Sequence, residues 1–266
     1  MTIAAALRQA LSTADPLAKV MQTRRVARDW RFGRLAHEFD CKMPDRPARP
    51  EAPELLSPAK MPRRSGGVGG RIAMLHALAH IEFNAIDLAL DMAGRFGDGL
   101  PRDFVSDWLS VAADEAMHFA LLDRRLRSLG SHYGALPAHD GLWEAASSTA
   151  HDLLARIAIV PLVLEARGLD VSPMTIARFE RQGDQLSARI MQRIYTDEIR
   201  HVGVGTTWLT KLCESQGISS ISHWKLMVGT YFRGALKPPF NDSARESAGL
   251  TRDYYEALAI VADSPQ

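Results

Sequence analysis

Two short motifs in this chain pair a glutamate with a histidine three residues later. They are Glu115 with His118 and Glu198 with His201. On a helix, residues i and i+3 project from one face, so a carboxylate and an imidazole converge at each motif. These groups are ligands for cations such as iron and manganese. A single such motif is weak evidence, because a surface carboxylate beside a partly buried histidine produces the same letters.

The two motifs belong to a longer repeat. Glu82 precedes Glu115 by 33 residues, and Glu165 precedes Glu198 by the same interval. Glutamate fills 12 of 266 positions, so the two coincidences together have a chance of about 0.2%. Two glutamates and two Glu-x-x-His pairs from four helices form the ligand set of a dinuclear metal site in a four-helix bundle. The alternative is a structural bundle with buried ion pairs, which are costly in a low-dielectric core.

An aspartate precedes each motif glutamate, so the pattern Glu-(x31)-Asp-Glu-x-x-His occurs twice. It resembles the signature of the di-iron carboxylate enzymes of the ferritin-like superfamily, usually Asp-Glu-x-Arg-His. The second copy matches in full, with Asp197 and Arg200, whereas the first has Met117 in place of the arginine. Residues 78–82, 164–170 and 238–241, within about 45–258, further resemble a bacterial ferritin-like family of unknown function. Di-iron transfer-RNA hydroxylases are distantly similar.

The resemblance implies an all-α fold, a ferritin-like four-helix bundle with N- and C-terminal helical extensions. It also implies a cofactor of two iron ions, with manganese or a mixed pair as alternatives. The implied metal ligands are Glu82, Glu115, His118, Glu165, Glu198 and His201. In that arrangement Glu115 and Glu198 bridge the metals, and each histidine gives one nitrogen. Asp114, Asp197 and Arg200 would lie behind the ligands, although either aspartate could instead be a solvent-facing charge.

The first two bundle helices are predicted at 71–96 and 101–129. Leu78, Glu82 and Ala85 share one apolar stripe of the first helix. A carboxylate within such a stripe must be paired or metal-bound, because burying it alone is expensive. Gly130 is expected to end the second helix.

The second half should repeat this layout. A third helix carries Glu165, with a kink at Pro161 and a break at Gly168–Pro173, where a Ser-Pro pair restarts a short helix. The fourth helix is predicted from about Gln185 to Trp208 or beyond, with Asp184 as its N-cap. These four helices make up a bundle over residues 71–216.

Three further segments flank the bundle. Residues 1–42 form an N-terminal helical extension broken at Asp15-Pro16, and residues 43–70 form a linker rich in proline and glycine that cannot sustain a helix. Residues 217–266 form a C-terminal helical extension, with helices at 222–236 and 243–261 around a loop at 237–241. Five arginines follow at helical spacings in the first extension: Arg24, Arg25, Arg28, Arg31 and Arg34. They form either a basic face for an anionic partner such as RNA or a solvated face paired with Asp29 and Glu38.

Composition limits the class of protein. The 32 basic and 31 acidic residues give a net charge of +1, which argues against a general nucleic-acid-binding field but not against a local patch. Cys41 and Cys213 give no disulfide framework. No signal peptide is expected, and no apolar run approaches the roughly 20 residues of a membrane span. A cytoplasmic enzyme is the default expectation.

The favoured function is an oxygen-activating oxidoreductase, either a hydroxylase or an oxidase. Its partners would be dioxygen, an unidentified small-molecule substrate and an unidentified electron donor. The alternatives are an iron-handling protein of the ferroxidase or storage type and a metal-free structural bundle. A transfer-RNA-modifying hydroxylase is a special case of the first function, which the near-neutral charge disfavours.

Overall fold

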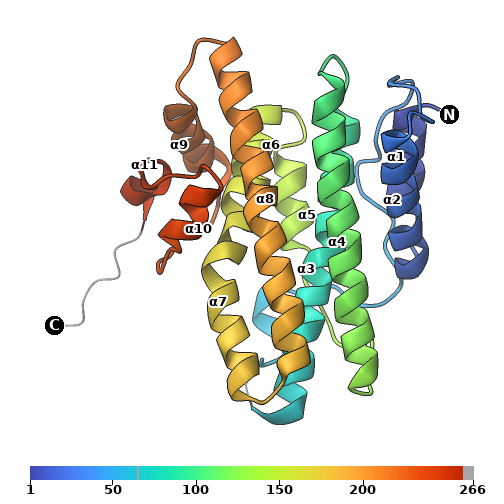
Figure 1. Cartoon of the computed structure of the whole chain (residues 1–266), viewed down its shortest axis with the longest axis vertical. Helices are drawn as coiled ribbons and strands as arrows, with labels where there is room; N and C mark the ends of the chain where they lie inside the picture. Colours follow the sequence, from blue (N-terminus) through green and yellow to red (C-terminus); the bar gives the residue numbers. More distant parts are fainter. Residues whose placement is uncertain (65, 260–266) are drawn as a thin grey trace. The chain divides into compact units, whose positions relative to one another are not determined.

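The computed structural model describes residues 1–64 and 66–259, and within these residues the chain is helical with no β-strand. The predicted all-α class is therefore confirmed. The chain divides into two compact units, Met1–Glu144 and Ala145–Gln266, which are described separately. Figure 1 follows the helices along the chain by colour. The division into extensions, linker and bundle stays a prediction.

Unit 1 is built on two long helices that pack against each other, α3 (Gly67–Phe96) and α4 (Arg102–Ser128). Gly130 follows α4 in the left-handed region with φ +76°, as predicted. The expectation that the glycine-rich stretch cannot be helical is wrong, because α3 begins at Gly67 rather than Arg71. Extending a long helix needs no new nucleus, so a glycine cost of about 1 kcal/mol per residue is tolerated.

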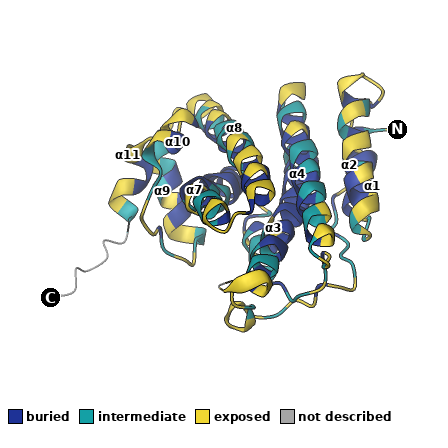
Figure 2. Ribbon diagram, turned by 60° about the horizontal axis from the view of Figure 1, so that its bottom comes forward, coloured by how far each residue is buried: buried dark blue, intermediate teal, exposed yellow. Residues whose placement is uncertain are grey.

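Most of α3 is buried (Figure 2). By length and composition alone α3 could cross a membrane, contrary to the expectation that no apolar run is long enough. However, 72% of the most apolar 18-residue stretch of α3 is buried inside the structure. The buried side chains of α3 also include three acids, Glu82, Asp87 and Asp91. These are features of the core helix of a soluble protein, where buried charges have partners.

Two shorter helices precede this pair, α1 (Ile3–Leu11) and α2 (Pro16–Arg31). The chain breaks between them at the predicted position. The Asp15 carboxylate accepts a hydrogen bond from the N–H of Ala18, and Pro16 opens α2 where no N–H is needed. Helix α1 packs on α3 and α2 packs on α4, so the N-terminal helices cover the central pair.

The proline-rich segment before α3 has little regular structure, as predicted, apart from a short 3-10 turn, η1 (Pro58–Lys60). It is tied to the chain that follows α4. The N–H of Leu56 donates to the Ala138 carbonyl at 2.8 Å, and the N–H of Ala138 donates to the Glu54 carbonyl at 2.9 Å.

Unit 2 contains a helix interrupted by a π-helical segment: α6 (Leu153–Ile159), η2 (Val160–Glu165) and α7 (Ala166–Arg181). All three pieces pack against one long helix, α8 (Gln185–Ser215). Asp184 caps α8 as predicted, accepting a hydrogen bond from the N–H of Ser187 at 3.0 Å. A short helix, α5 (Gly141–Ser148), spans the boundary between the units.

The predicted break at Gly168–Pro173 is wrong, because the chain stays helical there. Pro173 deprives the Leu169 carbonyl of its helical N–H donor, but the side-chain amide of Asn241 donates to that oxygen at 3.1 Å. The irregular backbone lies upstream instead. It contains Pro161, where a kink was predicted, and ends at the candidate ligand Glu165.

The C-terminal part consists of short helices: α9 (Ser220–Tyr231), α10 (Asp242–Ser247), α11 (Arg252–Tyr255) and the 3-10 turn η3 (Glu256–Leu258). The predicted single helix at 243–261 is wrong over its described part, since Gly249 at φ +76° separates α10 from α11. The end of that prediction lies outside the described residues. The helix predicted at 222–236 corresponds to α9, which ends five residues before Leu236, at Tyr231.

Gly205 permits the close approach of α8 to η2. A Cβ atom added there would lie 2.8 Å from Cβ of Pro161 and 3.0 Å from Cδ2 of Leu162. We predict that Gly205→Ala lowers the free energy of unfolding by about 1–3 kcal/mol through overpacking. The matched control Gly203→Ala, whose Cβ would meet its nearest neighbour at 3.9 Å, should be neutral or stabilise by up to about 1 kcal/mol. Urea unfolding compares them, and equal stabilities would contradict the close contact.

Candidate metal centre

Helix α4 places Glu115 and His118 on its buried face. Glu115 is 1% exposed and His118 is 0% exposed. Their spacing brings Oε2 of Glu115 to 3.4 Å from Nδ1 of His118. Val111, Ala112 and Leu122 are also fully buried, so the periodicity that buries apolar residues of α4 buries the two polar ones as well.

Helix α3 brings Glu82 to the same imidazole. Its Oε2 lies 3.1 Å from Nδ1 of His118, and the residue is 4% exposed. The ligand atoms of Glu82, Glu115 and His118 all lie within 4.8 Å of one another. The structure thus gathers three of the six predicted ligands within unit 1. We call these three residues the unit 1 cluster, and it could bind a metal ion.

The electrostatics of the unit 1 cluster favour a cation, because two carboxylates in a protein core are costly without positive charge nearby. Burial by itself lowers the pKa of His118. Hydrogen bonds and charges from Glu115 and Glu82 outweigh burial and raise the pKa of His118 to about 11. His118 is therefore protonated at neutral pH whenever no metal is bound. A metal ion would supply the same positive charge and displace the proton.

A second buried charge on α3 was not predicted. Asp87 is fully buried, and its carboxylate accepts hydrogen bonds from Nζ of Lys19 at 2.5 Å and Nη1 of Arg49 at 2.6 Å. These partners are a lysine and an arginine, which supply charge but no metal ligand, whereas the partner of Glu82 is a histidine, whose ring nitrogen can also bind a metal ion. In the sequence, Glu82 and Asp87 look alike, because each is a carboxylate inside an apolar stretch.

His80, also on α3, is buried, with 6% of its surface exposed. Its Nδ1 lies 2.9 Å from Oη of Tyr133, and its Nε2 lies 3.0 Å from the carbonyl oxygen of His139. Burial lowers the pKa of His80 to about 4. The ring is therefore neutral, and it donates to the carbonyl while accepting from the tyrosine hydroxyl.

Unit 2 carries the second motif on α8. Glu198 is 8% exposed and His201 is 0% exposed, with Oε1 of Glu198 at 3.6 Å from Nδ1 of His201. Nη2 of Arg200 lies 3.4 Å from Nε2 of the same histidine. Glu165 is half-buried at the end of η2, the segment that packs against α8. Both motif residues are thus buried together, as the pattern requires.

The two aspartates before the motifs are less buried than the glutamate and the histidine of each motif. Oδ2 of Asp197 accepts a hydrogen bond from Nε of Arg193 at 2.6 Å in an exposed contact on α8. Asp114 is half-buried and borders a groove between α2 and α4. A role for either aspartate in orienting a histidine ligand stays a prediction.

The protonated His118 gives a testable pH dependence. Its pKa of about 11 in the folded protein lies above the ordinary value of 6.5. The stabilisation is therefore complete below pH 6.5 and is lost as pH rises toward 11, by at most about 1.4 kcal/mol per pH unit. Denaturant unfolding with a chelator at pH about 7 and about 8.5 should show this loss, and His118→Gln should remove it.

Added Mn(II) should have the opposite dependence, stabilising wild-type protein more at the higher pH, because metal binding displaces the proton. Two results would contradict a protonated His118. One is wild-type stability that does not change between these pH values in the chelator. The other is an undiminished pH dependence in His118→Gln.

Comparison with known proteins assigns the chain to a family. A family model described as "Protein of unknown function (DUF455)" matches residues 12–256. An uncharacterized protein of Haemophilus influenzae is 42% identical over 212 residues, which cover 77% of this chain and 74% of that protein. No solved structure matches the chain. The match over most of the sequence shows that this chain belongs to the DUF455 family of proteins of unknown function.

Proposed function

We propose that this protein is a metal-dependent oxidoreductase that activates dioxygen, with two iron ions as its cofactor, or manganese or a mixed pair. The observation that carries the proposal is the buried convergence of Glu82 and Glu115 on Nδ1 of His118. An interior built for stability alone gains more from apolar side chains than from buried charges. A cluster of this kind is better explained by a cation that it holds.

The donor atoms of the unit 1 cluster fit iron or manganese. Two carboxylates and one imidazole are oxygen and nitrogen ligands, which suit hard and borderline cations. The two glutamates would balance the charge of the ion, and His118 would give its nitrogen after losing the proton. Three protein ligands leave room in the coordination sphere for water, dioxygen or substrate.

The second ion is assigned to the second repeat. Its ligands would be Glu165, Glu198 and His201, which have the same sequence spacing as the residues of the unit 1 cluster. The burial of Glu198 and His201 supports this assignment. That the two ligand sets belong to one dinuclear centre of the ferritin-like kind rests on the repeat and on the resemblance.

When bound, a pair of ferrous ions supplies electrons that activate dioxygen for hydroxylation or dehydrogenation of an organic substrate. The residues of the chain hold the ions and keep water away. Phe83 and Phe119 each follow a candidate ligand directly, and their ring centroids lie 5.1 Å apart. This buried aromatic pair packs α3 against α4, the two helices that carry the unit 1 cluster.

Anaerobic loading with Fe(II), followed by air, tests the proposal. Wild-type protein should bind about two iron ions per chain, consume dioxygen and show a transient visible absorption band. Glu82→Gln and His118→Gln should each weaken iron binding at least about tenfold, because each removes a donor from the unit 1 cluster. Glu214→Gln, at an exposed position of α8, is the matched control and should behave as wild type.

Failure of the folded wild-type protein to bind either iron or manganese would contradict the proposal. Oxidation of many iron ions per chain, together with a large multimer on gel filtration, would instead support the iron-storage alternative. Loss of iron binding in Glu214→Gln equal to that in Glu82→Gln would show that the unit 1 cluster is not the metal site.

A further inference from the structure

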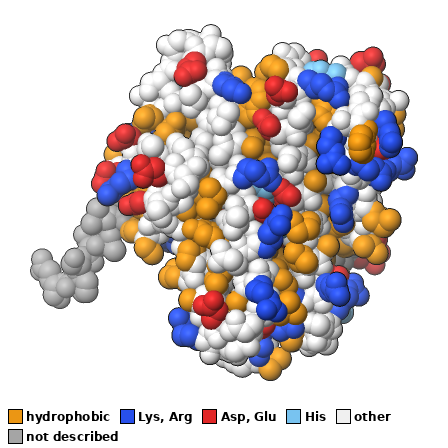
Figure 3. Space-filling view, in the orientation of Figure 1, with side chains coloured by type: hydrophobic (Ala, Val, Ile, Leu, Met, Phe, Trp, Pro, Cys, Tyr) orange, Lys and Arg blue, Asp and Glu red, His pale blue; other side chains and the backbone are white. Residues whose placement is uncertain are grey.

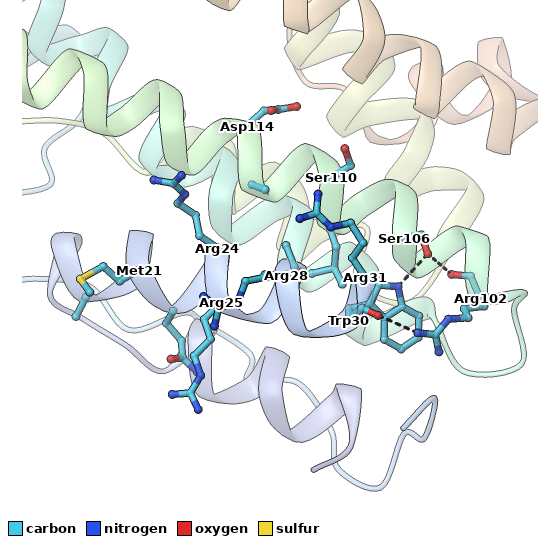
Figure 4. Close-up of a pocket in the computed structure, with 15 residues that line it drawn as sticks. Met21, Arg24, Arg25, Arg28, Trp30, Arg31, Arg102, Ser106, Ser110 and Asp114 are labelled. Atoms are coloured by element: carbon cyan, nitrogen blue, oxygen red, sulfur yellow. Dashed lines mark hydrogen bonds between the residues drawn. The ribbon is translucent and has the colours of Figure 1, made fainter. Parts of the chain in front are cut away.

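A groove of about 1160 Å³ lies between α2 and α4 in unit 1 (Figure 4). Five arginines line it: Arg24, Arg25, Arg28 and Arg31 of α2, and Arg102 of α4. The volume exceeds the roughly 300–1,000 Å³ of pockets that enclose small ligands. The size of the groove therefore suits an extended ligand better than a single small anion.

Positive charge is concentrated on this side of unit 1. Residues 24–34 contain five arginines and one acid, Asp29, a net charge of +4 in a chain whose total is +1. Three arginines share the Asp29 carboxylate, with Arg34 at 3.1 Å, Arg28 at 3.4 Å and Arg25 at 3.6 Å. One acid cannot neutralise them all, so the face retains a positive potential. Figure 3 shows Lys and Arg side chains gathered where α2 lies.

The arginines are arranged in a row. Arg24, Arg28 and Arg31 follow the i, i+4, i+7 spacing of one helical face, and all three are exposed. Figure 4 shows Arg31 reaching toward Ser110 of α4, while the carboxylate of Asp114 points away from the arginines. A row of guanidinium groups along a groove fits a ligand with negative charges at regular intervals.

The N-terminal end of α4 holds the groove together. The Arg102 guanidinium lies 3.6 Å from the ring centre of Trp30, and its Nη2 donates to the Trp30 carbonyl at 3.0 Å. The indole N–H of Trp30 donates to Oγ of Ser106 at 2.9 Å. These contacts fix α2 to α4, so the groove is formed before any ligand arrives, which lowers the entropic cost of binding.

An exposed aromatic residue lies beside the arginine row. Phe32 is 59% exposed, and the guanidinium carbons of Arg31 and Arg34 lie 5.3 Å and 5.2 Å from its ring centre. A solvent-accessible ring flanked by arginines is a stacking surface for a nucleobase. The aspartate and glutamate side chains of an acidic peptide have no aromatic face that could stack on this ring.

We propose that the groove between α2 and α4 binds a single strand of nucleic acid, with the arginine row on its phosphodiester backbone and Phe32 against a base. Arginine binds phosphate through two parallel N–H donors. A concave groove accepts one strand, whereas a duplex is read by an element that enters its own groove. This proposal is independent of the metal centre, and its test needs no metal.

Fluorescence anisotropy with the full-length protein and labelled 12-nucleotide strands, one of RNA and one of DNA, tests the proposal. Affinity should fall linearly with salt on logarithmic axes. The triple variant Arg24→Ala/Arg28→Ala/Arg31→Ala should bind at least about tenfold more weakly. Its salt slope should be smaller by about 2, since each single-strand phosphate contact contributes about 0.7. A preference for RNA or DNA identifies the natural strand, and either preference supports the proposal.

Two controls separate the proposed contacts from general effects. The variant Arg8→Ala/Arg181→Ala/Arg189→Ala removes the same charge from exposed positions outside the groove and should bind within about twofold of wild type. Phe32→Ala should bind at least about fivefold more weakly with an unchanged salt slope, since stacking releases no counterions. Circular dichroism verifies that each variant is folded. If the triple variant does not fold, the single substitution Arg24→Glu, at an exposed position, replaces it.

Three results would overturn the proposal. The first is no binding of either strand by wild-type protein at about 50 mM salt, where phosphate contacts are strong. The second is equal binding by the groove triple variant and the control triple variant. The third is displacement of the strands by a poly-glutamate peptide of equal charge as efficiently as by unlabelled nucleic acid, which would assign the groove to an acidic protein segment.

Discussion

Two buried carboxylates that share one imidazole nitrogen set the main constraint on unit 1. Removing Glu82 and Glu115 from water costs free energy, and a nearby cation offsets part of that cost. The long pair of α3 and α4 satisfies this constraint, because it holds both acids against His118 away from solvent. Either a proton on His118 or a bound metal ion can supply the positive charge. A buried ion pair that only stabilises the fold has no such alternative.

The contrast with Asp87 shows why the choice of cation matters. Asp87 is equally buried, but Lys19 and Arg49 neutralise it through partners that belong to the chain. That arrangement joins α2 and the proline-rich segment to α3. At Glu82 the partner is a histidine whose proton can be exchanged for a metal ion. Helix α3 thus carries one acid that stabilises the fold, Asp87, and one acid that is available to bind a metal ion, Glu82.

The sequence predicted the elements that depend on local pattern. Glu-x-x-His spacing located the paired residues on α4 and α8, and the Asp15-Pro16 and Asp184 signals located helix starts. Features that depend on distant partners escaped it. Lys19 lies 68 residues from Asp87, and Asn241, whose amide supports the helix across Pro173, lies 72 residues from Leu169. No local periodicity reports such contacts, because folding alone brings these residues together.

We propose that the unit 1 cluster holds a metal ion. Anomalous diffraction from crystals of the Fe(II)- or Mn(II)-loaded protein, recorded on both sides of the absorption edge of the metal, tests it most directly. We expect an element-specific peak within coordination distance of Glu82, Glu115 and His118, with Nδ1 of His118 no longer hydrogen-bonded to the glutamates. A peak elsewhere in the loaded protein, with His118 still paired with both carboxylates, would contradict it.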